Sequence, residues 1–61
     1  MNAKMITFSR QDNIIRVYYT GKYVGFFRFD YTSLRWLSFV SEAKHLPHQM
    51  IDYEFCEFIG E

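Results

Sequence analysis

The crowding of aromatic side chains into the middle of the chain constrains its fold more than any other feature of the sequence. Aromatic residues make up 21% of the 61 residues, and nine of these rings lie between positions 18 and 39. Such residues favour strands and bury large areas when they pack. A chain of this length forms one domain, residues 1–61, with a core that is barely sufficient. We therefore expect a sheet-rich fold in which some rings stay outside the core.

Two polar turns divide the first thirty residues into three segments with the pattern of strands. Residues 5–10 alternate between apolar and polar side chains, and residues 14–20 and 23–29 are rich in β-branched and aromatic types. Asp12 and Asn13 suit a tight turn because both tolerate positive φ, and Gly21 with Lys22 supplies a second turn. The pattern predicts an antiparallel three-stranded meander.

Two-residue turns at these places also predict which residues share a face of the sheet. Residues opposite each other in a hairpin point to the same side, so Val17 lies opposite Phe8 on one strand and opposite Phe26 on the other. One face then collects apolar residues, namely Ile6, Phe8, Ile15, Val17, Tyr19, Val24 and Phe26. The opposite face mixes polar groups, an arginine and several rings: Thr7, Ser9, Ile14, Arg16, Tyr18, Tyr23, Gly25, Phe27 and Phe29.

A helical period replaces the strand pattern after residue 29. Asp30 or Thr32 can cap a helix over residues 33–46, and Pro47 ends it because proline disfavours helical geometry in the residue before it. Apolar side chains fall within one half of its helical wheel. They are Trp36, Leu37, Phe39, Val40, Ala43 and Leu46.

The tail, residues 48–59, fits two patterns. Ile51, Tyr53 and Phe55 alternate with polar residues, as in a strand, whereas Ile51, Phe55, Phe58 and Ile59 also fit one side of a helix that begins at Pro47. The strict alternation and the aromatic content favour the strand. The predicted fold is thus a small α+β domain of two layers: a three-stranded antiparallel meander covered by one amphipathic helix, with a fourth, C-terminal strand, in the order βββαβ.

No motif in the sequence carries chemistry. His45 and His48 flank Pro47 but lack a paired metal-ligand module, and Cys56 has no orienting group that would make it a nucleophile. We therefore predict no enzyme activity, no catalytic residues, no cofactor and no metal. Seven basic residues balance seven acidic ones, which argues against a duplex-DNA binder. With a single cysteine and no apolar run long enough for a signal peptide or a membrane span, a soluble, cytoplasmic protein is expected.

The face of the sheet that the helix leaves uncovered is the candidate functional surface. We expect a protein partner to bind there, most simply a second copy in a homodimer, because exposed aromatic patches with an arginine are typical of interface cores. By analogy, such small proteins are often regulators, inhibitors or accessory factors. The alternative is a binder of single-stranded nucleic acid, although the acidic tail would repel its backbone. The predicted partner-binding residues are Arg16, Tyr18, Tyr23, Phe27 and Phe29.

Overall fold

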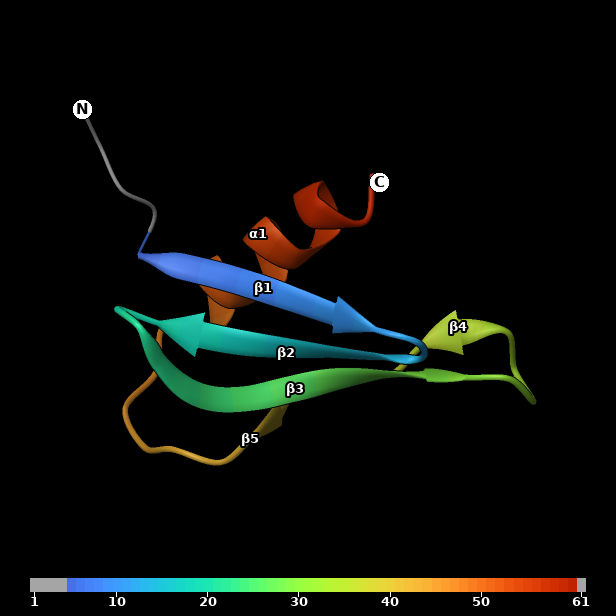
Figure 1. The fold of residues 1–61 in the computed structure, drawn as a ribbon, viewed down its shortest axis with the longest axis horizontal. Coiled ribbons are helices and arrows are strands. Elements are labelled where there is room, and N and C mark those ends of the chain that lie inside the picture. The colour runs from blue at the N-terminus through green and yellow to red at the C-terminus, as the bar shows by residue number, and fades with distance from the viewer. Residues whose placement is uncertain (1–4, 61) are drawn as a thin grey trace.

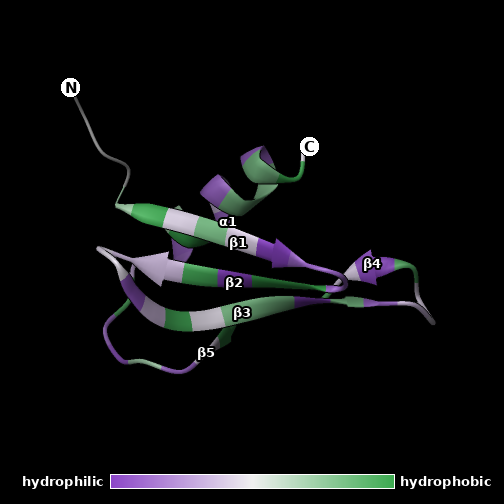
Figure 2. Ribbon diagram, viewed as in Figure 1, coloured by the Kyte–Doolittle hydropathy of each residue, from purple (hydrophilic) through white to green (hydrophobic). Residues whose placement is uncertain are grey.

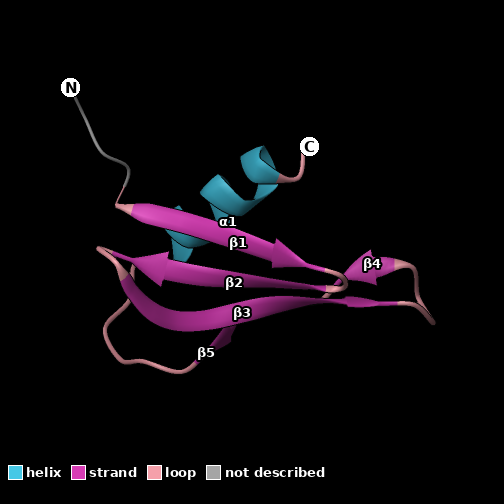
Figure 3. Ribbon diagram, viewed as in Figure 1, coloured by secondary structure: helices cyan, strands magenta, loops and turns pink. Residues whose placement is uncertain are grey.

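A curled antiparallel sheet with a helix on its inner side forms the part of the chain that the computed structural model describes, residues 5–60 (Figure 1). Neighbouring strands follow the order β1-β2-β3-β4, β5 also pairs with β3, and the sheet curls into a half-barrel. The helix, α1, packs behind β1 and β2 (Figure 3). The elements are β1 Ile6–Gln11, β2 Ile14–Tyr19, β3 Lys22–Asp30, β4 Arg35–Trp36, β5 Val40–Ser41 and α1 His48–Phe58.

The first hairpin forms as predicted. Asp12 and Asn13 make the two-residue loop, and the register pairs Phe8 with Val17. Asp12 adopts a φ of +57°, a conformation that a short polar side chain tolerates well. Hydrophobic and hydrophilic residues alternate along β1 and β2 (Figure 2), as expected for strands whose two faces meet different surroundings.

The second hairpin turns one residue earlier than predicted. Its loop is Thr20 and Gly21, with Tyr19 paired to Lys22. Both loop residues have positive φ, +51° for Thr20 and +86° for Gly21, which is the geometry that matches the twist of the flanking strands. Glycine therefore occupies the second loop position, so the predicted loop of Gly21 and Lys22 is wrong by one residue.

β3 carries an extra residue that shifts its pairing with β2. Tyr18 pairs with Tyr23, but the neighbouring residue of β2, Val17, pairs with Gly25. Val24 therefore has no partner on β2. Such a bulge bends the strand and increases its twist, which fits the strong curvature of β3 in Figure 1.

The bulge exchanges the faces of two phenylalanines. Phe27 pairs with Ile15 and is buried in the core, whereas Phe26 pairs with Arg16 on the other face. The predicted pairing of Phe26 with Val17 is therefore wrong. The other six members of the predicted apolar face are buried or pack against the core as expected.

The predicted helix over residues 33–46 does not form. The chain turns at residues 31–34 and runs back along β3 through β4 and β5, where Trp36 pairs with Phe29 and Val40 pairs with Phe26. Hydroxyl-bearing and aromatic residues dominate the first half of this segment, and such residues lose little by leaving a helix. The expected helix cap, Asp30, does cap a turn. Its carboxylate accepts hydrogen bonds from the Ser33 hydroxyl at 2.6 Å and from the backbone N–H of Thr32 at 3.3 Å.

The Asp30 turn makes a pH-dependent contribution to stability. Hydrogen bonds from the Ser33 hydroxyl and from backbone N–H groups lower the pKa of Asp30 below its ordinary value of 3.8. Because the folded pKa lies below the unfolded one, the contribution is present above pH 3.8 and is lost as pH falls through the folded pKa. We expect Asp30→Ala to lower the thermal midpoint at neutral pH, with a smaller difference from the parent in acid. A difference that stays constant from neutral to acid pH would contradict this assignment.

The tail is a helix and not the predicted fourth strand, so the element order is βββββα in place of βββαβ. Pro47 precedes the first turn of α1, where its missing N–H costs nothing. Ile51 and Phe55 are the buried residues of α1. Their four-residue spacing places both on one side of the helix, as the helical alternative for this segment required.

The core lies between the inner face of the sheet and α1. Phe55 is at its centre: its ring stacks on Phe27 with 3.6 Å between centroids and meets the edges or faces of Phe8 and Trp36 at 6.0 and 5.7 Å. The fully or nearly fully buried apolar residues of the described chain are Ile6, Ile15, Val17, Val24, Phe27, Ile51 and Phe55.

Candidate functional site

The outer side of the sheet, away from α1, forms a continuous surface that we call the open face. Cross-strand partners share a face, and three rows of partners cross the sheet on this side. They are Thr7, Tyr18 and Tyr23; Ser9, Arg16, Phe26 and Val40; and Gln11, Ile14 and Arg28.

Three of the five predicted partner-binding residues lie on the open face. Arg16, Tyr18 and Tyr23 occupy neighbouring rows there. Phe27 is in the core, stacked on Phe55, so its expected place on the uncovered face is wrong. Phe29 is also on the inner side, half-buried beside Trp36. The bulge in β3 accounts for both errors, because it reverses the side-chain alternation from that point onward.

Sequence reasoning missed Phe26, Val40 and Arg28 as members of the open face. The signal that could have identified Phe26 is Gly25, because an isolated glycine inside a strand pattern often marks a bulge or a close backbone approach. Both apply here: Gly25 lies next to the bulge, and the carbonyl oxygen of Val40 would be 2.2 Å from a β-carbon at that position.

Hydrogen bonds order the polar side chains of the open face. The Arg16 guanidinium donates to Gln11 Oε1 at 2.9 Å, which holds it across β1 and β2. The Tyr23 hydroxyl donates to Glu42 Oε2 at 3.2 Å, and its ring meets the Tyr18 ring edge to face at 5.9 Å. Partial desolvation and then the negative charge of Glu42 raise the pKa of Tyr23 above 10.0, so this hydroxyl remains a donor at neutral pH.

Acidic side chains are concentrated on α1, although Glu42 lies on the open face beside Tyr23 and Arg10 lies over the Trp36 ring on the inner side. The open face carries Arg16 and Arg28, whereas α1 carries three carboxylates and neither lysine nor arginine on the opposite side. The acidic residues of α1 are Asp52, Glu54 and Glu57.

A hollow on the inner side of the sheet is lined by residue types that can catalyse reactions, but these residues lie too far apart to act together. It has a volume of about 380 Å³ and includes His48, Asp52 and Cys56 in its lining. These residues are four apart along α1, so the helix rise separates His48 from Cys56 by about 12 Å. A nucleophile and its base must lie within hydrogen-bond reach. Among residues 5–60, no three His, Cys, Asp or Glu side chains gather as metal ligands.

No family model, no curated protein and no solved structure matches this chain. Within the described residues, no helix has the length and apolar character needed to cross a bilayer.

Proposed function

We propose that this protein is a small, non-catalytic interaction module that associates through its open face, most simply with a second copy of itself, and that it acts as a regulator or accessory factor. The observation that supports this most is a group of apolar side chains on the open face. Tyr23 and Val40 are 42% and 45% exposed, and the half-buried Phe26 pairs with Val40 on the same face. Contiguous surfaces of this kind on soluble proteins usually bind a partner.

The charges at the two ends of β3 on the open face favour a second copy as the partner. Glu42 lies beside Tyr23 at one end, and Arg28 lies at the other end of the face, with Phe26 between them. A two-fold axis near Phe26 brings Arg28 of each copy toward Glu42 of the partner subunit. In an interface with two-fold symmetry each contact occurs twice, so the pair of Arg28 and Glu42 forms at both ends of the interface.

The size of the core supports the same proposal. Seven side chains of the described residues are buried, for a chain of 61 residues. Domains this small bury a low fraction of their surface and gain stability when a partner covers more of it.

The double variant Tyr18→Ser with Phe26→Ser tests the proposal. Both residues are outside the core, so folding is retained, while the loss of two rings weakens the interface. We expect light scattering to report a dimer for the parent at high concentration and a monomer for the variant.

The matched control is Met50→Ser with Tyr53→Ser, which removes two exposed side chains from α1 on the opposite side. We expect this control to remain dimeric, and circular dichroism should show all three proteins folded. A parent that is monomeric at high concentration, or a control that dissociates as readily as the open-face variant, would contradict association through the open face.

A binder of single-stranded nucleic acid is the second candidate, and the two arginines of the open face favour it. Stacking rings and arginines lie together on the open face, while the carboxylates of α1 lie beyond the sheet, where they repel a bound backbone less. This function predicts that a monomeric parent shifts a labelled oligothymidine, with affinity that falls steeply as salt rises. Absence of binding at low salt would exclude it.

A further inference from the structure

The outer edge of β1 is open. β1 pairs with β2 alone, and no other strand within residues 5–60 lies on its far side. Two hydrogen-bonded pairs of the first hairpin define the pattern of its ladder. One is Gln11 with Ile14 next to the loop, and the other is Met5 with Thr20, where Thr20 N–H donates to the Met5 carbonyl at 2.7 Å. Because hydrogen-bonded and non-hydrogen-bonded pairs alternate in an antiparallel ladder, the backbone groups of Ile6 and Phe8 point away from β2. They form a template for another strand.

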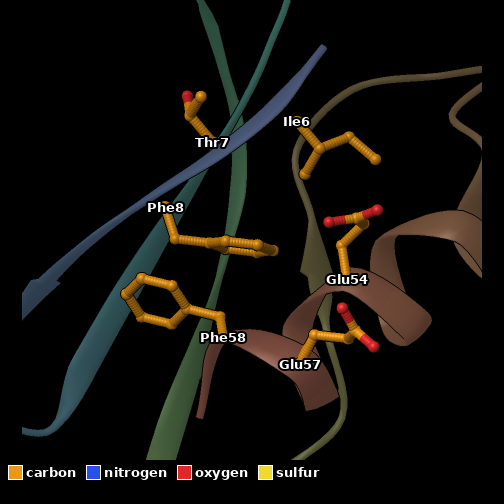
Figure 4. A pocket seen from close by; sticks show the side chains of 6 residues that line it. All are labelled: Ile6, Thr7, Phe8, Glu54, Glu57 and Phe58. Carbon is orange, nitrogen blue, oxygen red and sulfur yellow. The ribbon is translucent and has the colours of Figure 1, made fainter. Parts of the chain in front are cut away.

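A groove lies directly beside this edge, between β1 and α1 (Figure 4). It has a volume of about 340 Å³. Phe8 and Phe58 form its apolar wall, with 5.0 Å between ring centroids, and Phe58 is 46% exposed. The carboxylates of Glu54 and Glu57 lie on the helix side, whereas the Thr7 side chain points away from the helix. The groove therefore combines open strand backbone, aromatic rings and negative charge.

We propose that this edge and groove bind an extended, basic peptide segment of a partner protein, which adds to the sheet as a strand antiparallel to β1. The proposal concerns a different surface from the open face and does not depend on dimerisation. Every strand pair of the described sheet is antiparallel, so an added strand of the same orientation continues its twist. Backbone hydrogen bonds from Ile6 and Phe8 supply affinity, and alternate side chains of the peptide enter the groove.

The groove selects a lysine or arginine at the inward-facing position. The long aliphatic part of such a side chain can lie over the rings of Phe8 and Phe58, and its charged end then reaches Glu57. α1 contributes no lysine or arginine that would compete for this carboxylate. An acidic peptide meets like charge at the same place and is rejected.

A fluorescein-labelled peptide of alternating lysine and threonine is the probe, and fluorescence anisotropy is the measurement. We expect it to bind the parent, while the corresponding glutamate and threonine peptide does not. Glu57→Lys should weaken binding of the lysine peptide by roughly tenfold or more, as charge reversal at a contact does. Equal affinity for the two peptides, or no effect of Glu57→Lys, would overturn the proposal.

Backbone methylation distinguishes strand addition from simple charge attraction. In antiparallel addition, peptide residues whose side chains face the groove lie opposite Ile6 and Phe8 and use their own N–H groups. Methylating the lysine N–H groups should therefore abolish binding, and methylating the threonine N–H groups should leave it intact. Equal binding by the two methylated peptides would overturn strand addition.

The open-face variant separates this proposal from the proposed function. Tyr18→Ser with Phe26→Ser leaves the β1 edge and α1 unchanged, so the lysine peptide should bind this variant as it binds the parent. Loss of peptide binding in that variant would place the peptide on the open face and contradict the groove as its site.

Discussion

Gly25→Ala is expected to unfold the domain or to release β5 from β3. A β-carbon at this position would lie 2.2 Å from the Val40 carbonyl oxygen and 2.7 Å from the Phe39 ring, and the backbone φ is +154°. A backbone oxygen cannot move without breaking the pairing of Gly25 with Ser41. Overpacking and a strained backbone each cost about 1 to 3 kcal/mol. Their sum is comparable to the total stability expected of a chain this short, about 3 to 9 kcal/mol.

Gly21→Ala is the matched control for this substitution. Gly21 also has positive φ, +86°, but no atom lies within 4 Å of its missing β-carbon. The change therefore adds backbone strain without a clash, and we expect a loss of only about 1 to 2 kcal/mol in urea unfolding. Equal destabilisation by the two substitutions would show that the close approach of β5 to β3 is not what requires glycine at position 25.

Phe55→Ala is expected to cost about 3 to 5 kcal/mol, enough to leave much of the protein unfolded at room temperature. Phe55 is 5% exposed and contacts rings from three strands, through Phe8, Phe27 and Trp36. Its removal opens a cavity between α1 and the sheet, and residues 5–60 contain no second helix that could move in to fill it.

Tyr53→Ala tests whether this effect depends on position in α1. Tyr53 is two residues away on the same helix and 63% exposed, so its loss should change stability by no more than about 0.5 kcal/mol. Chemical denaturation followed by circular dichroism gives both values. Similar losses for Phe55→Ala and Tyr53→Ala would mean that α1 does not pack on the sheet through Phe55.

Local signals were sufficient to predict the first hairpin and most of the core. Asp12 and Asn13 set the loop length, and strict alternation in β1 set which side chains point inward. The antiparallel meander is confirmed for the same reason, since turn residues and period-two patterns act over a few residues only. The α+β class is also confirmed, although its helix lies in a different segment from the predicted one.

The face assignment in β3 failed because it depended on a single residue of register. Missing the extra residue at Val24 placed Phe27 outside and Phe26 inside, whereas the one-residue error in the loop shifts the pairing by two residues and leaves the faces unchanged. A one-residue slip moves every following side chain to the other face. The placement on the open face was therefore correct for Arg16 and Tyr18 on β2 and incorrect for Phe27 and Phe29 beyond the bulge.

The helix was assigned to the wrong segment because two segments have similar apolar spacing. Trp36 and Phe39 are three residues apart, a spacing that also occurs on one side of a helix. In the structure they belong to the segment that runs along the edge of β3 and pairs with it. Both segments contain strong helix formers, so intrinsic propensity does not distinguish them, but residues 48–58 follow a proline that can begin a helix. Which segment covers the sheet is decided by tertiary packing around Phe55, and local periodicity does not report it.

Nuclear Overhauser contacts between isotope-labelled and unlabelled copies, mixed at high concentration, give the most direct test of association through the open face. This measurement reports only contacts between different molecules. We expect intermolecular contacts to connect Phe26 and Val40 of one copy with the same row of the other. Intermolecular contacts that arise instead from exposed residues of α1 such as Tyr53, or no intermolecular contacts at all, would contradict it.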